Sequence, residues 1–242
     1  DIDVTQWTDP TPAMLQVSPA AAVEIETVLS PAMLIAGDEA AVSCTGLDDL
    51  GNAVTEGWSL NVTPKADTTG TPEGLVVTGL SIQGLTQGGY EVACAQPDGS
   101  QDTTPALLTV THGLPHTLVT TLDDDLIEAG DSTGLTCRAE DKHGNEVPDF
   151  LFSVAPLDHV AVVGMDVTSH VTGMYVIRCV PGDLGDWSTY ALESALLEVV
   201  PGPPVSLSIG LQPPKPYFAT YELIQLVIQP RDAFDNHVPD AP

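Results

Sequence analysis

The sequence has few positive charges and no long apolar run. Lys and Arg together number 6 against 34 Asp and Glu residues, so the formal net charge of the 242-residue chain is −28. A chain this acidic repels the phosphates of nucleic acids and of anionic membranes, and neither is expected as a partner. No apolar run approaches the roughly 18 residues that cross a bilayer, so no membrane span is expected in this segment. The acidic residues are interpreted as a solvated surface, with divalent-cation binding as the alternative.

Catalytic motifs are also absent from the sequence. It contains no Gly-x-Ser-x-Gly motif, no phosphate-binding glycine-rich loop and no pair of carboxylates in a recognisable cleft motif. We therefore expect no catalytic residues, no enzyme activity and no cofactor.

Apolar residues alternate with polar ones through most of the chain, as at Tyr90, Val92 and Cys94, and no segment shows a sustained helical period. A period of two predicts strands with one buried and one solvated face. Turn signals punctuate these segments at short intervals. The pattern predicts an all-β fold of antiparallel β-sandwiches with about seven strands each. The internal repeats and the paired cysteines described below make the prediction one of tandem immunoglobulin-like sandwiches. Asn61, which begins an N-glycosylation sequon, is expected to face outward from its strand.

One phrase occurs three times, as "DDLGNAV", "DKHGNEV" and "DAFDNHV". The final asparagines of the three turns, Asn52, Asn145 and Asn236, are 93 and 91 residues apart. Upstream, "AGDEAAVSC" matches "AGDSTGLTC", and downstream "ALLTVTHGLPHTL" matches "ALLEVVPGPPVSL". The segment "AMLQVSPAAAVEI" repeats that last junction near the start of the chain. Such internal repetition predicts an array of similar units.

The repeat divides the chain into four parts. Residues 1–19 are expected to be the last strand of a preceding unit, and 20–112 and 113–201 two full immunoglobulin-like domains. Residues 202–242 are expected to begin a further, incomplete domain. The chain is thus predicted to be an excerpt of a longer tandem array.

The repeated phrase is interpreted as a structural turn. Gly accepts a positive φ without a Cβ penalty, Asn tolerates the left-handed region, and Asp accepts backbone N–H groups within a turn. The residues concerned are Asp48, Gly51, Asn52, Asp141, Gly144, Asn145, Asp232 and Asn236. The alternative is a calcium site, but each turn offers fewer than the roughly six oxygen ligands that calcium takes.

A second candidate for calcium is the run Asp123, Asp124 and Asp125 near a unit boundary. The matching segments of the other units, "LSPAMLI" and "LQPPKPY", contain no acid. A repeated calcium site between units is therefore not expected, and a single site stays open as the alternative to no metal.

Four cysteines are distributed two to each full unit. We expect the bonds Cys44–Cys94 and Cys137–Cys179, because each joins an early strand to a late one and other pairings would cross between repeats. The alternative is four free buried thiols. The expected core aromatics are Trp58, Phe150, Tyr90 and Tyr175. Disulfide bonds indicate export to an oxidising compartment.

The phrase "DDLGNAV" or "DKHGNEV", with "AGD" upstream and Gly-x-Tyr before the late strand, resembles bacterial immunoglobulin-like repeats of the invasin and intimin group. The resemblance covers residues 13–242. It implies an exported bacterial protein, secreted or at the cell surface, with a stalk-like or adhesive role. The sequence departs from that group in having a cysteine pair in each full unit. The third unit also lacks the first cysteine and has "DAFDN" where the others have "DxxGN".

Short junctions that contain Pro115, Pro203 and Pro204 favour a semi-rigid rod over flexibly linked domains. The sequence thus predicts a non-enzymatic extracellular stalk module, whose partners are neighbouring immunoglobulin-like domains of a longer parent or other copies of the chain. One alternative is an adhesin whose domain-end loops bind a surface receptor. Another is a subunit of a polymerising extracellular filament.

Overall fold

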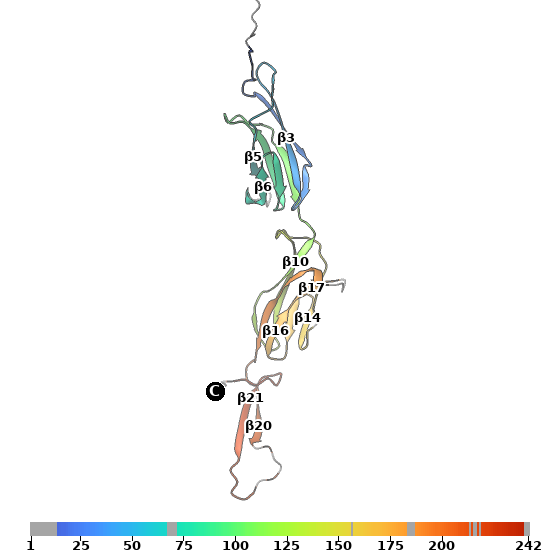
Figure 1. Cartoon of the computed structure of the whole chain (residues 1–242). Coiled ribbons are helices and arrows are strands. Elements are labelled where there is room, and N and C mark those ends of the chain that lie inside the picture. The colour runs from blue at the N-terminus through green and yellow to red at the C-terminus, as the bar shows by residue number, and fades with distance from the viewer. Residues whose placement is uncertain are drawn as a thin grey trace, which may run out of the picture. The chain divides into compact units, whose positions relative to one another are not determined.

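In the computed structural model of the chain, residues 14–66, 72–155, 157–182, 187–212, 214, 217 and 219–239 are described. Contacts divide the chain into two units, Asp1–Thr111 and His112–Pro242. The described residues form strands and two short 3-10 helices, and no α-helix occurs among them (Figure 1). The all-β fold class predicted from the period of two is therefore confirmed.

The first unit contains one β-sandwich, which we call the first module. Its elements are β1 (Glu24–Ser30), β2 (Met33–Ile35), β3 (Glu39–Leu47), β4 (Ala53–Val54), β5 (Ser59–Pro64), η2 (Pro72–Gly74), β6 (Leu75–Thr78), β7 (Ser81–Gly84), β8 (Gly88–Ala95) and β9 (Ala106–Thr111). One sheet has the order β1-β3-β7-β6, with β4 paired to β3, and the other has the order β2-β9-β8-β5. The core lies between them, and its largest fully buried side chains include Ile82, Tyr90 and Leu108.

The first module has more strands than the seven or so that its sequence predicts, because its first strand is divided. β1 pairs antiparallel with β3, whereas β2 pairs parallel with β9 of the other sheet. Pro31 lies between the two pieces. Since proline has no backbone N–H to donate to a ladder, the chain leaves one sheet there and joins the other. The very short β4 adds a further strand.

The second module repeats this plan within the second unit. Its elements are β10 (Pro115–Leu122), β11 (Leu126–Glu128), β12 (Ser132–Asp141), β13 (Phe152–Val154), β14 (Val160–Val163), β15 (Asp166–Ser169), β16 (Gly173–Ile177), β17 (Cys179–Pro181), η3 (Trp187–Thr189), β18 (Ala191–Glu193) and β19 (Ala195–Val200). One sheet has the order β14-β15-β12-β10-β18, and the facing strands pair as β11-β19-β16 and β13-β17. Leu135, Val167, Ile177 and Leu197 are buried in its core.

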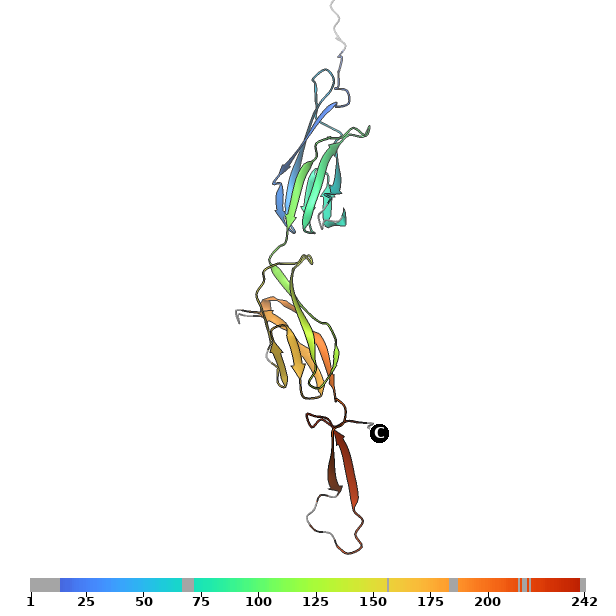
Figure 2. The same cartoon turned by 180° about the vertical axis from the view of Figure 1, so that it is seen from behind.

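The second unit ends in a hairpin of β20 (Ser206–Gln212) and β21 (Gln225–Arg231), drawn in red in Figure 2. Ile209 lies opposite Ile228 in the ladder, as Thr120 lies opposite Cys137 in the second module. The side chains of Ile209 and Ile228 are 66% and 57% exposed. No sheet covers this apolar face among the described residues of the second unit.

The described part of the predicted first segment, residues 14–19, forms no strand, and residues 1–13 lie outside the described residues. Leu15 and Val17 are 88% and 80% exposed. By sequence they correspond to Leu108 and Val110, which are buried on β9. A strand is held by hydrogen bonds to its neighbours, and residues 14–19 pair with none of the described strands.

Candidate functional site

The three copies of the aspartate turn have the same hydrogen bonds. In the first module, Oδ1 of Asp48 accepts the backbone N–H groups of Leu50 at 3.0 Å and Asn52 at 2.8 Å, and the Asn52 side-chain amide donates to Oδ2 at 2.9 Å. The corresponding distances are 2.8, 3.0 and 2.9 Å around Asp141, and 2.9, 2.8 and 2.8 Å around Asp232. Each carboxylate therefore closes its own turn.

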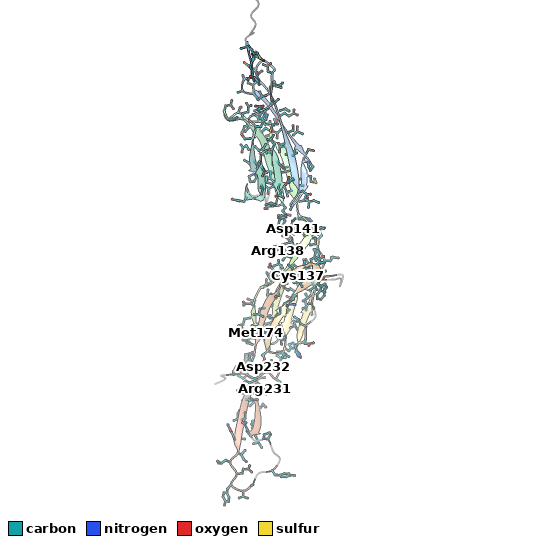
Figure 3. The ribbon with its side chains drawn as sticks, in the orientation of Figure 1. Cys137, Arg138, Asp141, Met174, Arg231 and Asp232 are labelled. Carbon is teal, nitrogen blue, oxygen red and sulfur yellow. A yellow bond between two sulfur atoms is a disulfide. The ribbon has the colours of Figure 1, made fainter. Side chains whose placement is uncertain are left out.

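The same carboxylates also hold the segment that enters each module. Oδ2 of Asp48 accepts the N–H of Ala20 at 3.1 Å, shortly before β1 begins. Oδ2 of Asp141 accepts the N–H of Gly113 at 2.7 Å, and Oδ2 of Asp232 accepts the N–H of Gly202 at 3.2 Å. We call this bond the linker latch. Figure 3 labels Asp141 and Asp232, the latch residues of the second unit.

Backbone conformation explains which residue types occupy the fourth position of the turn. Gly51 and Gly144 have φ angles of 80° and 81°, and Asp235 of the third copy has 67°. These values lie in the left-handed region, which glycine enters without cost and which Asp and Asn tolerate better than most residues. The third turn therefore keeps the geometry of the other two although it reads "DAFDN".

Burial and hydrogen bonding act in opposite directions on these carboxyls. For Asp141, burial alone would raise the pKa, but hydrogen bonds from Gly113, Asn145 and His143 outweigh it and hold the pKa below its ordinary value. The pKa of Asp232 is lowered in the same way against its burial. For Asp48 the side-chain bond from Asn52 is the largest cause of a lowered pKa. All three turns thus bind the ionised carboxylate better than the neutral acid.

Acid should therefore weaken these turns. Since the folded pKa of Asp48 lies below its reference value of 3.8, the stabilisation is complete above that pH and is lost as pH falls through the folded value. We expect the urea midpoint of the first module to fall between neutral pH and about pH 2. In Asp48→Asn the midpoint should be lower at neutral pH and should depend less on pH. Asp49→Asn, which makes the same charge change at the adjacent exposed position, should keep the wild-type pH dependence. Equal pH profiles for the two variants would contradict this assignment.

Both predicted cysteine pairs are bonded in the structure, Cys44 to Cys94 and Cys137 to Cys179, with Cα–Cα distances of 5.7 and 5.8 Å. Each bond joins the two sheets of its module. A buried threonine, which the sequence analysis did not identify, lies beside each bond. The Thr27 hydroxyl accepts the N–H of Cys94 at 2.9 Å, and the Thr120 hydroxyl accepts that of Cys179 at the same distance. A threonine occurs at the same position of both modules, and this recurrence in the sequence could have identified it.

The predicted core aromatics occupy different environments. Tyr90 is fully buried, and its hydroxyl donates to the carbonyl oxygen of Thr86 at 2.8 Å. Tyr175 is partly buried, and its hydroxyl donates to Val171 at the same distance. Trp58 packs, partly buried, against the first core. Each tyrosine ties the start of its strand to a preceding loop, in the manner of a tyrosine corner.

Phe150, the remaining aromatic predicted for a core, is half-buried. Phe152 packs against the second core, whereas Phe150 precedes β13 and contacts the rings of Phe152 and Tyr190 at centroid distances of 4.9 and 6.0 Å. Both phenylalanines lie on one face of an alternating pattern, which does not distinguish between them. The ladder of β13 with β17 begins at Phe152, and Asp149, before both phenylalanines, has a φ of 59°.

The run Asp123, Asp124 and Asp125 lies in the exposed connection from β10 to β11. Thr133 holds its backbone, since the Asp124 N–H donates to the Thr133 hydroxyl at 2.8 Å. Among the described residues, no group of three or more His, Cys, Asp or Glu side chains is placed to hold a metal ion.

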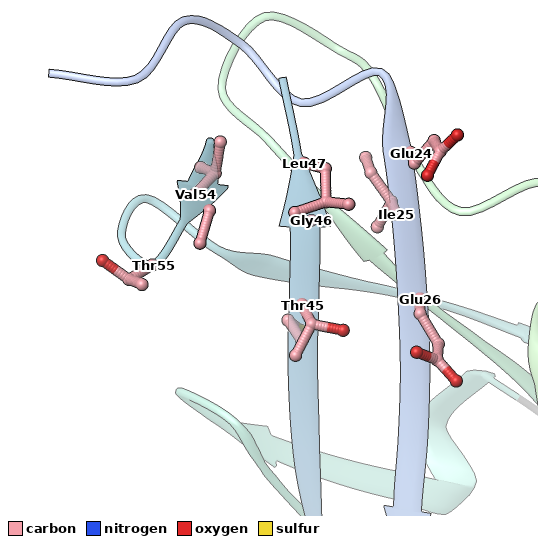
Figure 4. Close-up of a pocket in the computed structure, with 10 residues that line it drawn as sticks. Glu24, Ile25, Glu26, Thr45, Gly46, Leu47, Val54 and Thr55 are labelled. Carbon is pink, nitrogen blue, oxygen red and sulfur yellow. The ribbon is translucent and has the colours of Figure 1, made fainter. Parts of the chain in front are cut away.

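A surface hollow of about 720 Å³ lies along β1, β3 and β4 in the first module. Figure 4 shows Glu24 and Glu26 projecting from β1 on one side, with Val54 and Thr55 on the other. Its lining has no histidine, lysine or free thiol, because its one cysteine, Cys44, is bonded to Cys94.

Among the described residues no helix is long and apolar enough to cross a membrane. No protein-family model matches the sequence, and neither does any curated protein. Several solved structures are similar to the chain.

The Escherichia coli adhesin FdeC is 21% identical, with a TM-score of 0.47, over 93% of this chain and 79% of that one. The Yersinia pseudotuberculosis adhesin InvE is 16% identical, with a TM-score of 0.34, over 73% of this chain and 58% of that one. The bacterial integrin-binding protein invasin, from the group that the turn motif resembles, is 16% identical, with a TM-score of 0.35, over 81% of this chain and 43% of that one. At these values the similarities do not assign the chain a family or a function.

Proposed function

We propose that the chain is a non-enzymatic structural segment of an extracellular surface protein, in which successive β-sandwich modules act as a spacer. The linker latch carries this proposal. A buried carboxylate in each of three turns is bonded to the N–H of the segment that enters the module. A part-buried, charge-assisted hydrogen bond that recurs in the three described turns holds the entering segment against its module.

The two disulfides support a location outside the cytosol, because such bonds persist in oxidising compartments. The resemblance of the turn motif to bacterial immunoglobulin-like repeats supports a bacterial cell surface. The acidic chain supports a solvated module that repels anionic surfaces.

The apolar face of the β20–β21 hairpin supports a third module that begins at residue 202. Leu207, Ile209 and Leu211 are all exposed on β20. In the second module the residue equivalent to Leu207 is Leu118, which is fully buried in its sandwich. The hairpin thus has apolar residues like those that one sheet of the second module contributes to its core. Two strands alone are marginally stable in water.

Small-angle X-ray scattering tests the spacer role. Duplicating residues 113–201 within the full chain should increase the maximum dimension by about the length of one module, because each module has its own core. An unchanged maximum dimension would show modules that fold back on each other and would overturn the proposal.

The same scattering series, repeated over a range of concentrations, tests how the hairpin face is covered. The full chain and a chain that ends at residue 201 should both remain monomeric if the face belongs to an unfinished third module. Association of the full chain alone would instead support the filament alternative, in which a second copy covers the face. Adhesion of beads coated with the full chain to host cells would favour the adhesin alternative.

A further inference from the structure

The third aspartate turn makes contacts that leave its own hairpin. Phe234 occupies the turn position that Leu50 and His143 hold in the other two copies. Its ring stacks on the imidazole of His170, with a centroid distance of 4.4 Å and an interplanar angle of 4°. His170 follows β15 in the second module, so the stack joins the hairpin to that module.

The second module leaves room for the Phe234 ring at Gly130. A Cβ atom at Gly130 would overlap the Phe234 side chain, and the φ angle of Gly130 is +95°. Gly130 lies between β11 and β12, and its N–H donates to the Ser169 carbonyl oxygen at 2.9 Å. The two loops that contact Phe234 are thus hydrogen-bonded to each other. This bond lies within the second module and holds the surface that receives the ring.

Asn236 completes the contact with both ends of its side-chain amide. Its Oδ1 accepts the N–H of Thr172 at 3.2 Å, and its Nδ2 donates to the carbonyl oxygen of His170 at 2.8 Å. The same Nδ2 donates to Asp232, which accepts the N–H of Gly202 in the linker. One turn therefore supplies the stacked ring of Phe234, the two hydrogen bonds of the Asn236 amide and the linker latch of Asp232.

We propose that the turn Asp232–Asn236 docks onto the end of the second module, and that Gly130, His170 and Thr172 form the receptor surface for this turn. The docked turn holds the third module at a fixed angle to the second. This inference rests on the proposed spacer role and gives it a residue-level basis, since a spacer keeps its two ends apart only if its joints resist bending. The partner of the receptor surface is the turn of the next module along the chain.

Amide exchange and relaxation, measured by NMR on the full chain, test the joint. In Phe234→Ala, exchange of the Thr172 amide should accelerate about tenfold, because a stacked ring pair and the hydrogen bond beside it are lost. Relaxation of β20 and β21 amides should then indicate faster tumbling than that of β12. His170→Ala, which changes only the receptor side, should have the same effect. Leu50→Ala, at the equivalent position of the first turn, should change neither measurement.

Two outcomes would overturn the joint. One is unchanged Thr172 exchange and unchanged relaxation in both Phe234→Ala and His170→Ala. The other is faster exchange at Gly210 and Val227, paired within the hairpin, in both variants, which would show loss of the hairpin itself. Failure of the joint would leave the scattering result for the duplicated module untouched, so the two proposals fail separately.

Discussion

Replacing Cys137 and Cys179 together by alanine is expected to lower the free energy of unfolding of the second module by about 4 kcal/mol. The bond closes a loop with a sequence separation of 42 residues, and removing it returns that conformational freedom to the unfolded chain. Cys179 is fully buried, so the lost sulfur atoms also leave unfilled space in the core. Since a domain of this size has a stability of roughly 5–15 kcal/mol, the loss is a large share of the total.

Hydrogen exchange followed by mass spectrometry under increasing urea measures this effect module by module. Peptides from β10 and β12 should lose protection at a lower urea concentration in the double variant, whereas peptides from β1 and β3 should not. The matched variant with Cys44 and Cys94 replaced should show the reverse, because each module has its own core. A double variant with wild-type protection in its own module would refute the stabilising role of the bond.

Replacing Asp141 by alanine is expected to destabilise the second module by about 3 kcal/mol. The carboxylate accepts hydrogen bonds from the backbone N–H groups of Gly113, His143 and Asn145 and from the Asn145 amide. Alanine accepts none of these bonds. The Gly113 and Asn145 donors would lose their charged acceptor, and Asn145 is itself buried.

The control for Asp141→Ala is Glu146→Ala, which removes one negative charge from an exposed residue of the same turn region. Its expected effect is within about 0.5 kcal/mol of zero. In the native state, the Gly113 amide should exchange faster in Asp141→Ala, while the Leu118 amide within β10 stays protected. Equal destabilisation by the two variants would contradict the latch.

The period of two and the spacing of the repeated phrase predict two sandwiches of similar plan, and the structure contains them. Alternation is enough for this, because a strand with one buried face needs apolar residues at every second position. The pairing of the cysteines follows from the same repetition. Neither signal distinguishes Phe150 from Phe152, because both satisfy the alternation. Only the contacts of the folded chain distinguish them, since Phe152 packs against the second core and Phe150 packs against Phe152.

Of the candidate site, the sequence by itself determined the turn residues, since Asp, Gly and Asn at fixed spacing specify a local backbone conformation. Only the tertiary structure decided what the carboxylate bonds beyond its own turn. The acceptors and donors of the linker latch are about 30 residues apart in sequence, and those of the Asn236 contact more than 60. Local preferences carry no information about such distant partners. They meet because the first strand of each module pairs beside the turn, and because the hairpin stacks Phe234 on the second module.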